Sequence, residues 1–171
     1  EYGDNEKVNG WMGASMESGW DRATLYENVP FDKERHILKM WDVALNGLYV
    51  MDCNALADIA TVLGKDDDAR ELRKKAQKYQ KNIQKLWDEK TGFFRNRNWE
   101  NGEFSDVTSV NGFFPLIANA ATKEQVKIIL ENYFFNEKEF YGKWILPTVA
   151  RSSPGYHDEE QYWDGKIWPP V

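Results

Sequence analysis

Carboxylates set among aromatic residues are the side chains of this sequence best suited to chemistry. The clearest case is Asp21, which ends the run Glu-Ser-Gly-Trp-Asp and is followed by Arg22. Gly19 lets the backbone approach a ligand closely, Trp20 offers an apolar face on which a sugar ring can stack, and Arg22 can hold a carboxylate or a hydroxyl group. Glycoside hydrolysis uses one carboxylic acid to protonate the leaving oxygen and one carboxylate to activate water. Spacing alone also allows a plainer role for Asp21, as the cap of a helix that begins near Ala23.

Other kinds of active site have no motif in the sequence. It contains no zinc-binding His-Glu-x-x-His, no Gly-rich phosphate loop and no Gly-x-Ser-x-Gly nucleophile elbow. His36 and His157 are far apart and have no Cys or Ser neighbour, so we expect both at the surface or in turns. The aspartates at 66–68 lack the Gly and the distal Glu of an EF-hand loop, so we expect no metal there.

Two stretches resemble signature sequences of known glycosidases. Residues 14–21, Ala-Ser-Met-Glu-Ser-Gly-Trp-Asp, are similar to the signature of trehalases and of glycoside hydrolase family 63. Residues 145–156 and 162–170, which include Tyr-Trp-Asp-Gly-Lys-Ile-Trp-Pro-Pro, resemble the Pro- and Trp-rich segment of family 63. Between them, 55–64 and 86–94 resemble the helix and hook of that family. The resemblance runs in order over nearly the whole chain and favours family 63 over the trehalases.

The resemblance implies an all-α fold, part of an (α/α)6 barrel with long aromatic-rich loops, with residues 1–171 forming part of its catalytic domain. It implies hydrolysis of an α-glucosidic or related α-linked bond with inversion and without a cofactor or metal, and it assigns Asp21 as the general acid. The residues implied to bind substrate are Gly19, Trp20, Arg22, Tyr162, Trp163, Asp164 and Trp168.

Two features of the resemblance leave questions open. Asp164 and Lys166 stand where Arg and Pro are common in the family, and an acidic residue at the pocket edge can accept hydrogen bonds from sugar hydroxyls. The exact sugar and linkage are therefore undetermined. The general base, a Glu in these families, follows the Trp-Pro-Pro segment, so we expect it beyond Val171, since Glu159 and Glu160 come too early.

The elements that must position these residues are helices joined by long loops. Helical spacing of apolar residues predicts a helix over 41–63 that is apolar on most sides and stops at Gly64. An amphipathic helix follows, capped by Asp66 or Asp67, with its apolar stripe reaching residue 86.

A second helical part follows a hook. Turn residues at 88–92 precede a short extended piece at 93–95, and Asn-Gly at 101–102 marks another turn. Residues 107–120 predict a buried helix interrupted near Pro115, and residues 122–125 form a capping box that opens a last helix.

This order of elements favours an antiparallel helical array, either an open solenoid or a closed toroid, over a parallel sheet. A toroid of six helix pairs, at on the order of 40 residues each, needs roughly 240 residues before its loops. The chain also begins without a methionine and ends at Val171 without a polar tail. We therefore expect part of a larger domain.

Composition narrows the possible partners. The net charge of −6 disfavours nucleic acid, which basic surfaces bind. No signal peptide and no membrane-spanning run is visible, so we expect a soluble chain of undetermined compartment, with Cys53 buried as a thiol. The aromatic content of 15%, with eight Trp, suits a core or a sugar site.

The expected partners are an oligosaccharide or disaccharide substrate and the remainder of the chain's own catalytic domain. Two rival hypotheses stay open, a trehalase and a non-catalytic carbohydrate-binding protein built on a helical toroid, because a fold does not fix a function. The second carboxylate is the feature that separates an enzyme from a binding protein.

Overall fold

A computed structural model describes residues 10, 12–15, 19–20, 23–26, 28–144, 146–157, 163–165 and 167–168. The chain divides into two compact units. The hairpin unit comprises Glu1–Trp41, Asn96–Val110 and Leu130–Val171, and the helical unit comprises Asp42–Arg95 and Asn111–Ile129.

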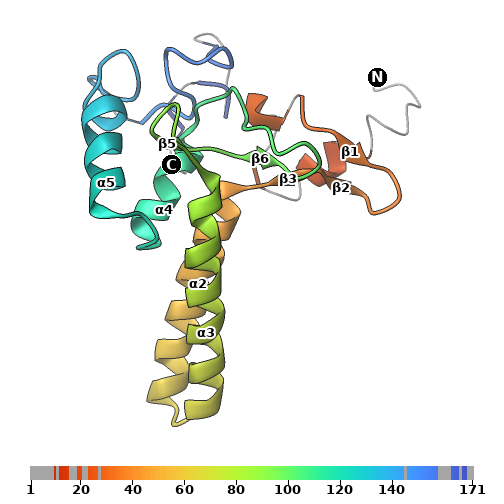
Figure 1. The fold of residues 1–171 in the computed structure, drawn as a ribbon, viewed down its shortest axis with the longest axis vertical. Coiled ribbons are helices and arrows are strands. Elements are labelled where there is room, and N and C mark those ends of the chain that lie inside the picture. Colours follow the sequence, from red (N-terminus) through yellow and green to blue (C-terminus); the bar gives the residue numbers. More distant parts are fainter. Residues whose placement is uncertain are drawn as a thin grey trace. The chain divides into compact units, whose positions relative to one another are not determined.

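The longest elements of the helical unit are α2 (Val43–Val62) and α3 (Asp66–Ile83), which lie side by side in opposite directions (Figure 1). The first turn of α2 is capped by Asp42, whose Oδ1 accepts a hydrogen bond of 2.8 Å from the backbone N–H of Leu45. The predicted helix over 41–63 is therefore confirmed, with ends one or two residues inside the predicted ones.

The turn between α2 and α3 determines where the second helix begins. Gly64 has a φ of +69°, in the left-handed region that favours glycine, and Lys65 N donates to Ala60 O at 2.8 Å. This confirms the predicted stop at Gly64. Because the chain leaves the turn already at Lys65, that residue is the N-cap of α3, and the predicted cap at Asp66 or Asp67 is wrong. The aspartates lie instead in the first helical turn, where negative charge offsets the helix dipole.

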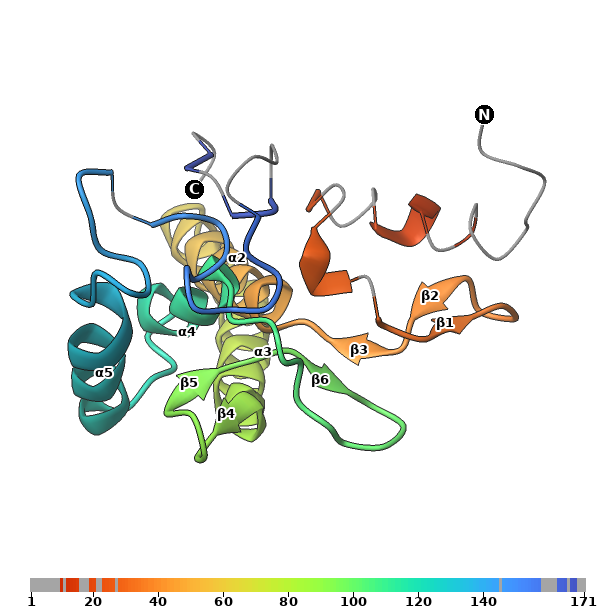
Figure 2. The same cartoon turned by 90° about the horizontal axis from the view of Figure 1, so that it is seen from above.

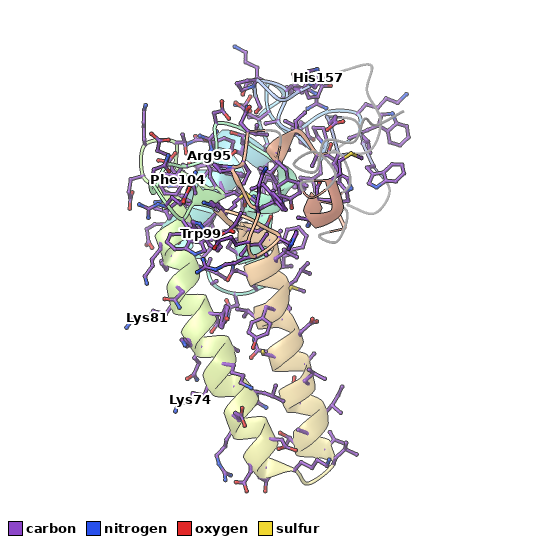
Figure 3. All side chains as sticks on the ribbon, turned by 90° about the vertical axis from the view of Figure 1, so that its right-hand side faces the viewer. Lys74, Lys81, Arg95, Trp99, Phe104 and His157 are labelled. Carbon is purple, nitrogen blue, oxygen red and sulfur yellow. The ribbon has the colours of Figure 1, made fainter. Side chains whose placement is uncertain are left out.

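The two long helices bury their apolar side chains differently. As predicted, α3 is amphipathic: it buries Ala69, Ala76 and Ile83, while Lys74 and Lys81 point away from α2 (Figure 3). In contrast, α2 is apolar on more than one side, and Cys53 is buried on it as predicted. Several large apolar side chains of α2 and of its C-cap residue are exposed to solvent. They are Leu45, Tyr49, Leu56, Ile59, Val62 and the C-cap Leu63. Large apolar side chains exposed in such number usually mark a surface that another element covers.

The predicted hook is a pair of antiparallel two-residue strands, β4 (Trp87–Asp88) and β5 (Phe93–Phe94). The carboxylate of Asp88 closes the turn between them, accepting hydrogen bonds from Lys90 N at 3.0 Å and from Thr91 Oγ1 at 2.9 Å. Both the turn and the extended piece are confirmed.

The helix predicted over 107–120 is wrong in its start and its length. The chain forms instead the 3-10 helix η3 (Val110–Phe113) and the short α4 (Phe114–Ile117). Pro115 lies in the first turn of α4, where a missing N–H leaves no intrahelical bond unmade, so it opens a helix and does not interrupt one. Before η3 the backbone is extended, since Ser109 forms a β-bridge with Val149.

The capping box at the start of α5 (Lys123–Ile129) is confirmed. Gln125 N donates to Thr122 Oγ1 at 3.2 Å, and Thr122 N donates to Gln125 Oε1 at 2.8 Å. Two further short helices are η2 (Gln84–Leu86) and the π-helical turn η4 (Leu130–Phe134).

Short antiparallel strand pairs organise the hairpin unit. β1 (Phe31–Asp32) pairs with β2 (Ile37–Leu38), and β3 (Met40–Trp41) pairs with β6 (Arg97–Asn98) (Figure 2). The 3-10 helix η1 (Thr24–Tyr26) precedes them and is buried. Every strand pair in the described part of the chain is antiparallel, in agreement with the expectation against a parallel sheet. Among the described residues, no helix has both the length and the apolarity needed to cross a membrane.

Both histidines lie where the sequence predicts. His36 is exposed in the turn between β1 and β2 with a φ of +54°, and His157 is exposed in the loop that follows Tyr156 (Figure 3).

Candidate active site

The two stretches that resemble glycosidase signatures meet in the hairpin unit. The rings of Trp20 and Trp163 lie with their centroids 4.3 Å apart and their planes at 60°. Trp20 is only 7% exposed, whereas Trp163 is half-buried. The tilted contact is a favourable geometry for two aromatic rings, and it brings together segments from opposite ends of the chain.

A hydrogen bond joins the same two segments a few residues further on. The backbone N–H of Thr24, the first residue of η1, donates to Asp164 Oδ1 at 2.9 Å across 140 residues of sequence. Thr24 Oγ1 also donates to Gly155 O at 3.1 Å, in a buried position. Between the aromatic contact and these bonds, Ala23 N donates to Trp20 O at 3.2 Å. The residues on either side of 21–22 are thereby fixed relative to each other and to 163–164.

The segment 163–165 is itself held by the chain before it. His157 N donates to Asp164 O and Gly165 N donates to Thr148 Oγ1, both at 2.8 Å. Gly165 has a φ of +126°, and a Cβ there would lie 2.8 Å from the ring of Tyr156. Only glycine suits this position, since both the backbone conformation and the available space exclude a side chain.

The other predicted site residues fall into two groups. Gly19 is exposed with a φ of +78°, a conformation that by itself explains glycine at this position, and Trp168 is half-buried. Asp21, Arg22 and Tyr162 lie outside the described residues, as do Glu159, Glu160 and Lys166. The roles assigned to all these residues stay predictions.

A cavity of about 480 Å³ lies beside η1 and was not foreseen from the sequence. Thr24 and Leu25 line one part of it, and the polar residues between 96 and 106 line another. Among these, Arg97 donates from Nε to Gly102 O at 2.7 Å, and its guanidinium lies 5.0 Å from the ring centre of Phe104. The polar lining residues that carry side-chain charge or an amide include Asn96, Arg97, Asn98, Glu103 and Asp106. The only sign of this cavity in the sequence is the run of polar residues that directly follows the buried pair Phe93 and Phe94.

Two ionisable side chains near the strands of the hairpin unit have shifted pKa values. The pKa of Asp32 is lowered, chiefly because the backbone N–H of Arg35 donates to its carboxylate. The pKa of Lys39 is raised, chiefly by its hydrogen bond to Glu100. These pairs fix the β1–β2 turn and the neighbouring loop. Among the described residues, no group of three or more His, Cys, Asp or Glu side chains is arranged to hold a metal ion.

Residues 10–171 match the family described as the mannosylglycerate hydrolase MGH1-like glycoside hydrolase domain. The chain belongs to this family. The match includes both the segment around Trp20 and the segment around Trp163, and it confirms the resemblance to glycoside hydrolase family 63.

Curated relatives carry the same name. The mannosylglycerate hydrolase MGH1 of Selaginella moellendorffii is 23% identical to the chain over 155 residues, which are 87% of this chain and 28% of that protein. The chain therefore spans less than a third of the length of this relative.

Solved structures of the family and of trehalases share the fold. The family 63 mannosylglycerate hydrolase of Thermus thermophilus in complex with glucose has a TM-score of 0.66 at 25% identity, over 75% of this chain and 30% of that one. The same enzyme in complex with Tris and D-glycerate has a TM-score of 0.74 at 19% identity, over 95% of this chain and 51% of that one. Neutral trehalase Nth1 of Saccharomyces cerevisiae has a TM-score of 0.69 at 23% identity, over 93% and 29%. The predicted fold class, part of a helical toroid, is confirmed.

Proposed function

We propose that this chain is part of the catalytic domain of an inverting glycoside hydrolase, in which Asp21 is the general acid. The observation that carries the proposal is the family match over 10–171, which includes the run Glu-Ser-Gly-Trp-Asp ending at Asp21. The contact between Trp20 and Trp163 supports it, because the second signature stretch lies against the first.

In the proposed reaction, the protonated carboxyl group of Asp21 gives its proton to the glycosidic oxygen as the bond from that oxygen to the anomeric carbon breaks. A glutamate beyond residue 171 takes a proton from water, and the water oxygen bonds to the anomeric carbon from the opposite face. The alcohol leaves, and the sugar is released with inverted configuration. Residues 1–171 would then supply the acid side of the site and a later segment the base.

The proposed sugar site is lined by aromatic side chains from both signature stretches. Trp20, Tyr162, Trp163 and Trp168 would form its walls, Gly19 would let the main chain come close, and Arg22 would contact hydroxyl groups. The cavity beside η1 supports a site near Asp21, because Thr24, which lines it, is three residues further along the chain.

The related proteins and the signature stretches support two classes of substrate. Mannosylglycerate is supported by the name of the family and of the plant relative, and by the complex of the bacterial enzyme with D-glycerate. Its glycerate part carries a carboxylate, for which the guanidinium of Arg97 in the cavity lining is a suitable partner. An α-glucoside is supported by the signature stretches and by the complex of the bacterial enzyme with glucose.

The full-length protein should therefore be incubated with mannosylglycerate, trehalose, nigerose, kojibiose and maltose, and the first-formed product examined by proton NMR. We expect hydrolysis of at least one of these compounds, with the released sugar appearing first as its β-anomer. Release of the α-anomer would contradict inversion. Saturable binding of a sugar without hydrolysis of any compound would favour the non-catalytic carbohydrate-binding alternative.

The aromatic wall gives a separate prediction. Trp163→Ala in the full-length protein should raise the inhibition constant of the sugar product up to about tenfold. The reason is that an aromatic contact contributes about 0.5–1.5 kcal/mol beyond its buried area. The matched control is Trp144→Ala, because Trp144 lies in the same unit and is 66% exposed. The measurement is product inhibition at fixed substrate on variants that keep the circular dichroism spectrum of the parent. An unchanged inhibition constant for Trp163→Ala would remove Trp163 from the sugar site.

A further inference from the structure

The main chain around the proposed general acid is fixed on both sides by one short segment. On the N-terminal side, Trp20 lies against Trp163, and on the C-terminal side, Thr24 N donates to Asp164 Oδ1 at 2.9 Å. Residues 163 and 164 are adjacent in the chain. A single segment therefore holds both ends of the stretch in which Asp21 stands.

The bond from Thr24 to Asp164 is suited to fixing a main-chain position. It is partly buried and has an ionisable acceptor, and hydrogen bonds with a charged partner are roughly twice as strong as neutral ones. The second bond of Thr24, from Oγ1 to Gly155 O, has the same effect. A Cβ at Gly155 would lie 2.8 Å from Thr24 Oγ1, so the two segments are in close contact there.

The acceptor side is equally well fixed. Asp164 O accepts from His157 N and the next residue, Gly165, donates to Thr148 Oγ1, both at 2.8 Å. The carboxylate is thus presented from a segment with main-chain bonds on either side of its own side chain. A fixed acceptor can set the position of the donor, whereas a mobile one would follow it.

We infer that Asp164 is a positioning residue, whose carboxylate fixes the main chain at Thr24 and thereby the placement of Asp21 against the substrate. The inference rests on the proposed function, in which Asp21 is the general acid. Asp21 precedes Thr24 by three residues in the sequence, so the two belong to one short stretch of chain. A displacement of Thr24 is carried to Asp21, and a misplacement of about 1 Å at a reacting group can cost on the order of 100-fold in rate.

This role differs in its consequences from that of a sugar ligand. A residue that binds the sugar equally in the ground state and the transition state changes KM and inhibitor affinity, whereas one that places the acid changes kcat. The amide of asparagine keeps an oxygen that can accept from Thr24 N, although it loses the charge. Asp164→Asn therefore preserves positioning, while Asp164→Ala removes the acceptor.

The test uses the full-length enzyme with the substrate that it hydrolyses best. Asp164→Ala is expected to lower kcat about 10- to 100-fold while the product inhibition constant changes less than about twofold, and Asp164→Asn is expected to keep kcat within about threefold. The matched control is Asp32→Ala, because Asp32 Oδ1 also accepts backbone N–H bonds, from Glu34 and Arg35 at 3.0 Å, in the same unit. This control is expected to keep the parent kcat.

Other outcomes overturn the inference. If Asp164→Ala and Asp164→Asn both weaken product inhibition and leave kcat near the parent value, Asp164 is a sugar ligand and not a positioning residue. If both variants lose kcat equally, the charge and not the acceptor is what matters, and positioning through Thr24 is excluded.

A further variant covers failure of Asp164→Ala to fold. Asp164→Glu keeps the charge and moves the acceptor by one methylene. Its kcat is therefore expected to be about one tenth of that of Asp164→Asn. The opposite order would overturn the inference. Failure of the proposed function is distinguishable, because then the parent enzyme hydrolyses no glycoside or Asp21→Asn keeps the parent kcat. Failure of the inference alone leaves the parent active and Asp21→Asn impaired.

Discussion

Asp21→Asn in the full-length enzyme is expected to lower kcat on an unactivated α-linked substrate by about 10²–10⁴-fold, the usual contribution of a general acid. The amide is nearly the same size as the carboxyl group but cannot deliver a proton to the leaving oxygen. Binding of the sugar product should be nearly unchanged, since the stacking walls are not altered. The measurement is the pair of kcat and product inhibition constant for parent and variant.

Leaving-group chemistry makes this test specific for a general acid. An aryl glycoside with a nitrophenol leaving group needs little protonation, so Asp21→Asn should lose much less activity on it than on the natural linkage. The control is Asp32→Asn, which changes a carboxylate in the β1–β2 turn and is expected to leave both substrates unaffected. Equal losses by Asp21→Asn on both substrates, or near-normal turnover of the unactivated one, would exclude Asp21 as the acid.

Features fixed by neighbouring residues could be predicted from the sequence. The stop at Gly64 follows from the left-handed backbone that glycine accepts, and the capping box of Thr122 and Gln125 follows from two side chains three residues apart. The hook closed by Asp88 is another case, because an aspartate binds N–H and hydroxyl groups two or three residues ahead. In each of these features the determining interaction joins residues that are only a few positions apart in the sequence.

Features decided by distant segments could not be predicted in this way. The backbone at Ser109 is extended because it pairs with Val149, so a helical pattern over 107–120 was overridden by a contact across the chain. The same limit applies to the candidate site: the sequence indicated that Trp20 and Trp163 belong to one site, but the bond between Thr24 and Asp164 spans 140 residues and has no local signal.

The exposed face of α2 bears on how much of the enzyme these residues can form alone. Ile59 is 55% exposed and Val62 is 86% exposed, although both are large apolar side chains on a long helix. The chain spans 28% of the plant relative and 51% of a matched chain of the bacterial enzyme. In a helical toroid, inner helices are covered by neighbouring pairs, so we expect residues from outside 1–171 to cover this face.

Residues 1–171 expressed alone are expected to show no detectable hydrolysis of mannosylglycerate, trehalose or maltose. An inverting site needs two carboxyl groups roughly 6.5–9.5 Å apart, so that a water molecule fits beside the anomeric carbon. Only the acid is proposed within this chain. Loss of the base removes the activation of water, and the exposed face of α2 should also make the separate chain associate in solution.

The decisive measurement is reconstitution. Residues 1–171 and the following segment of the protein would be expressed separately, assayed alone, and then assayed together, with residues 1–171 carrying Asp21→Asn as the matched control. We expect hydrolysis only in the mixture with the unchanged chain, because that mixture alone contains both carboxyl groups. Inverting hydrolysis by residues 1–171 alone would show that the base lies within them, and Asp164 and Glu160 would then be the residues to change next. Activity of the mixture that contains Asp21→Asn would instead require an acid from the second segment, and Asp21 would lose its assigned role.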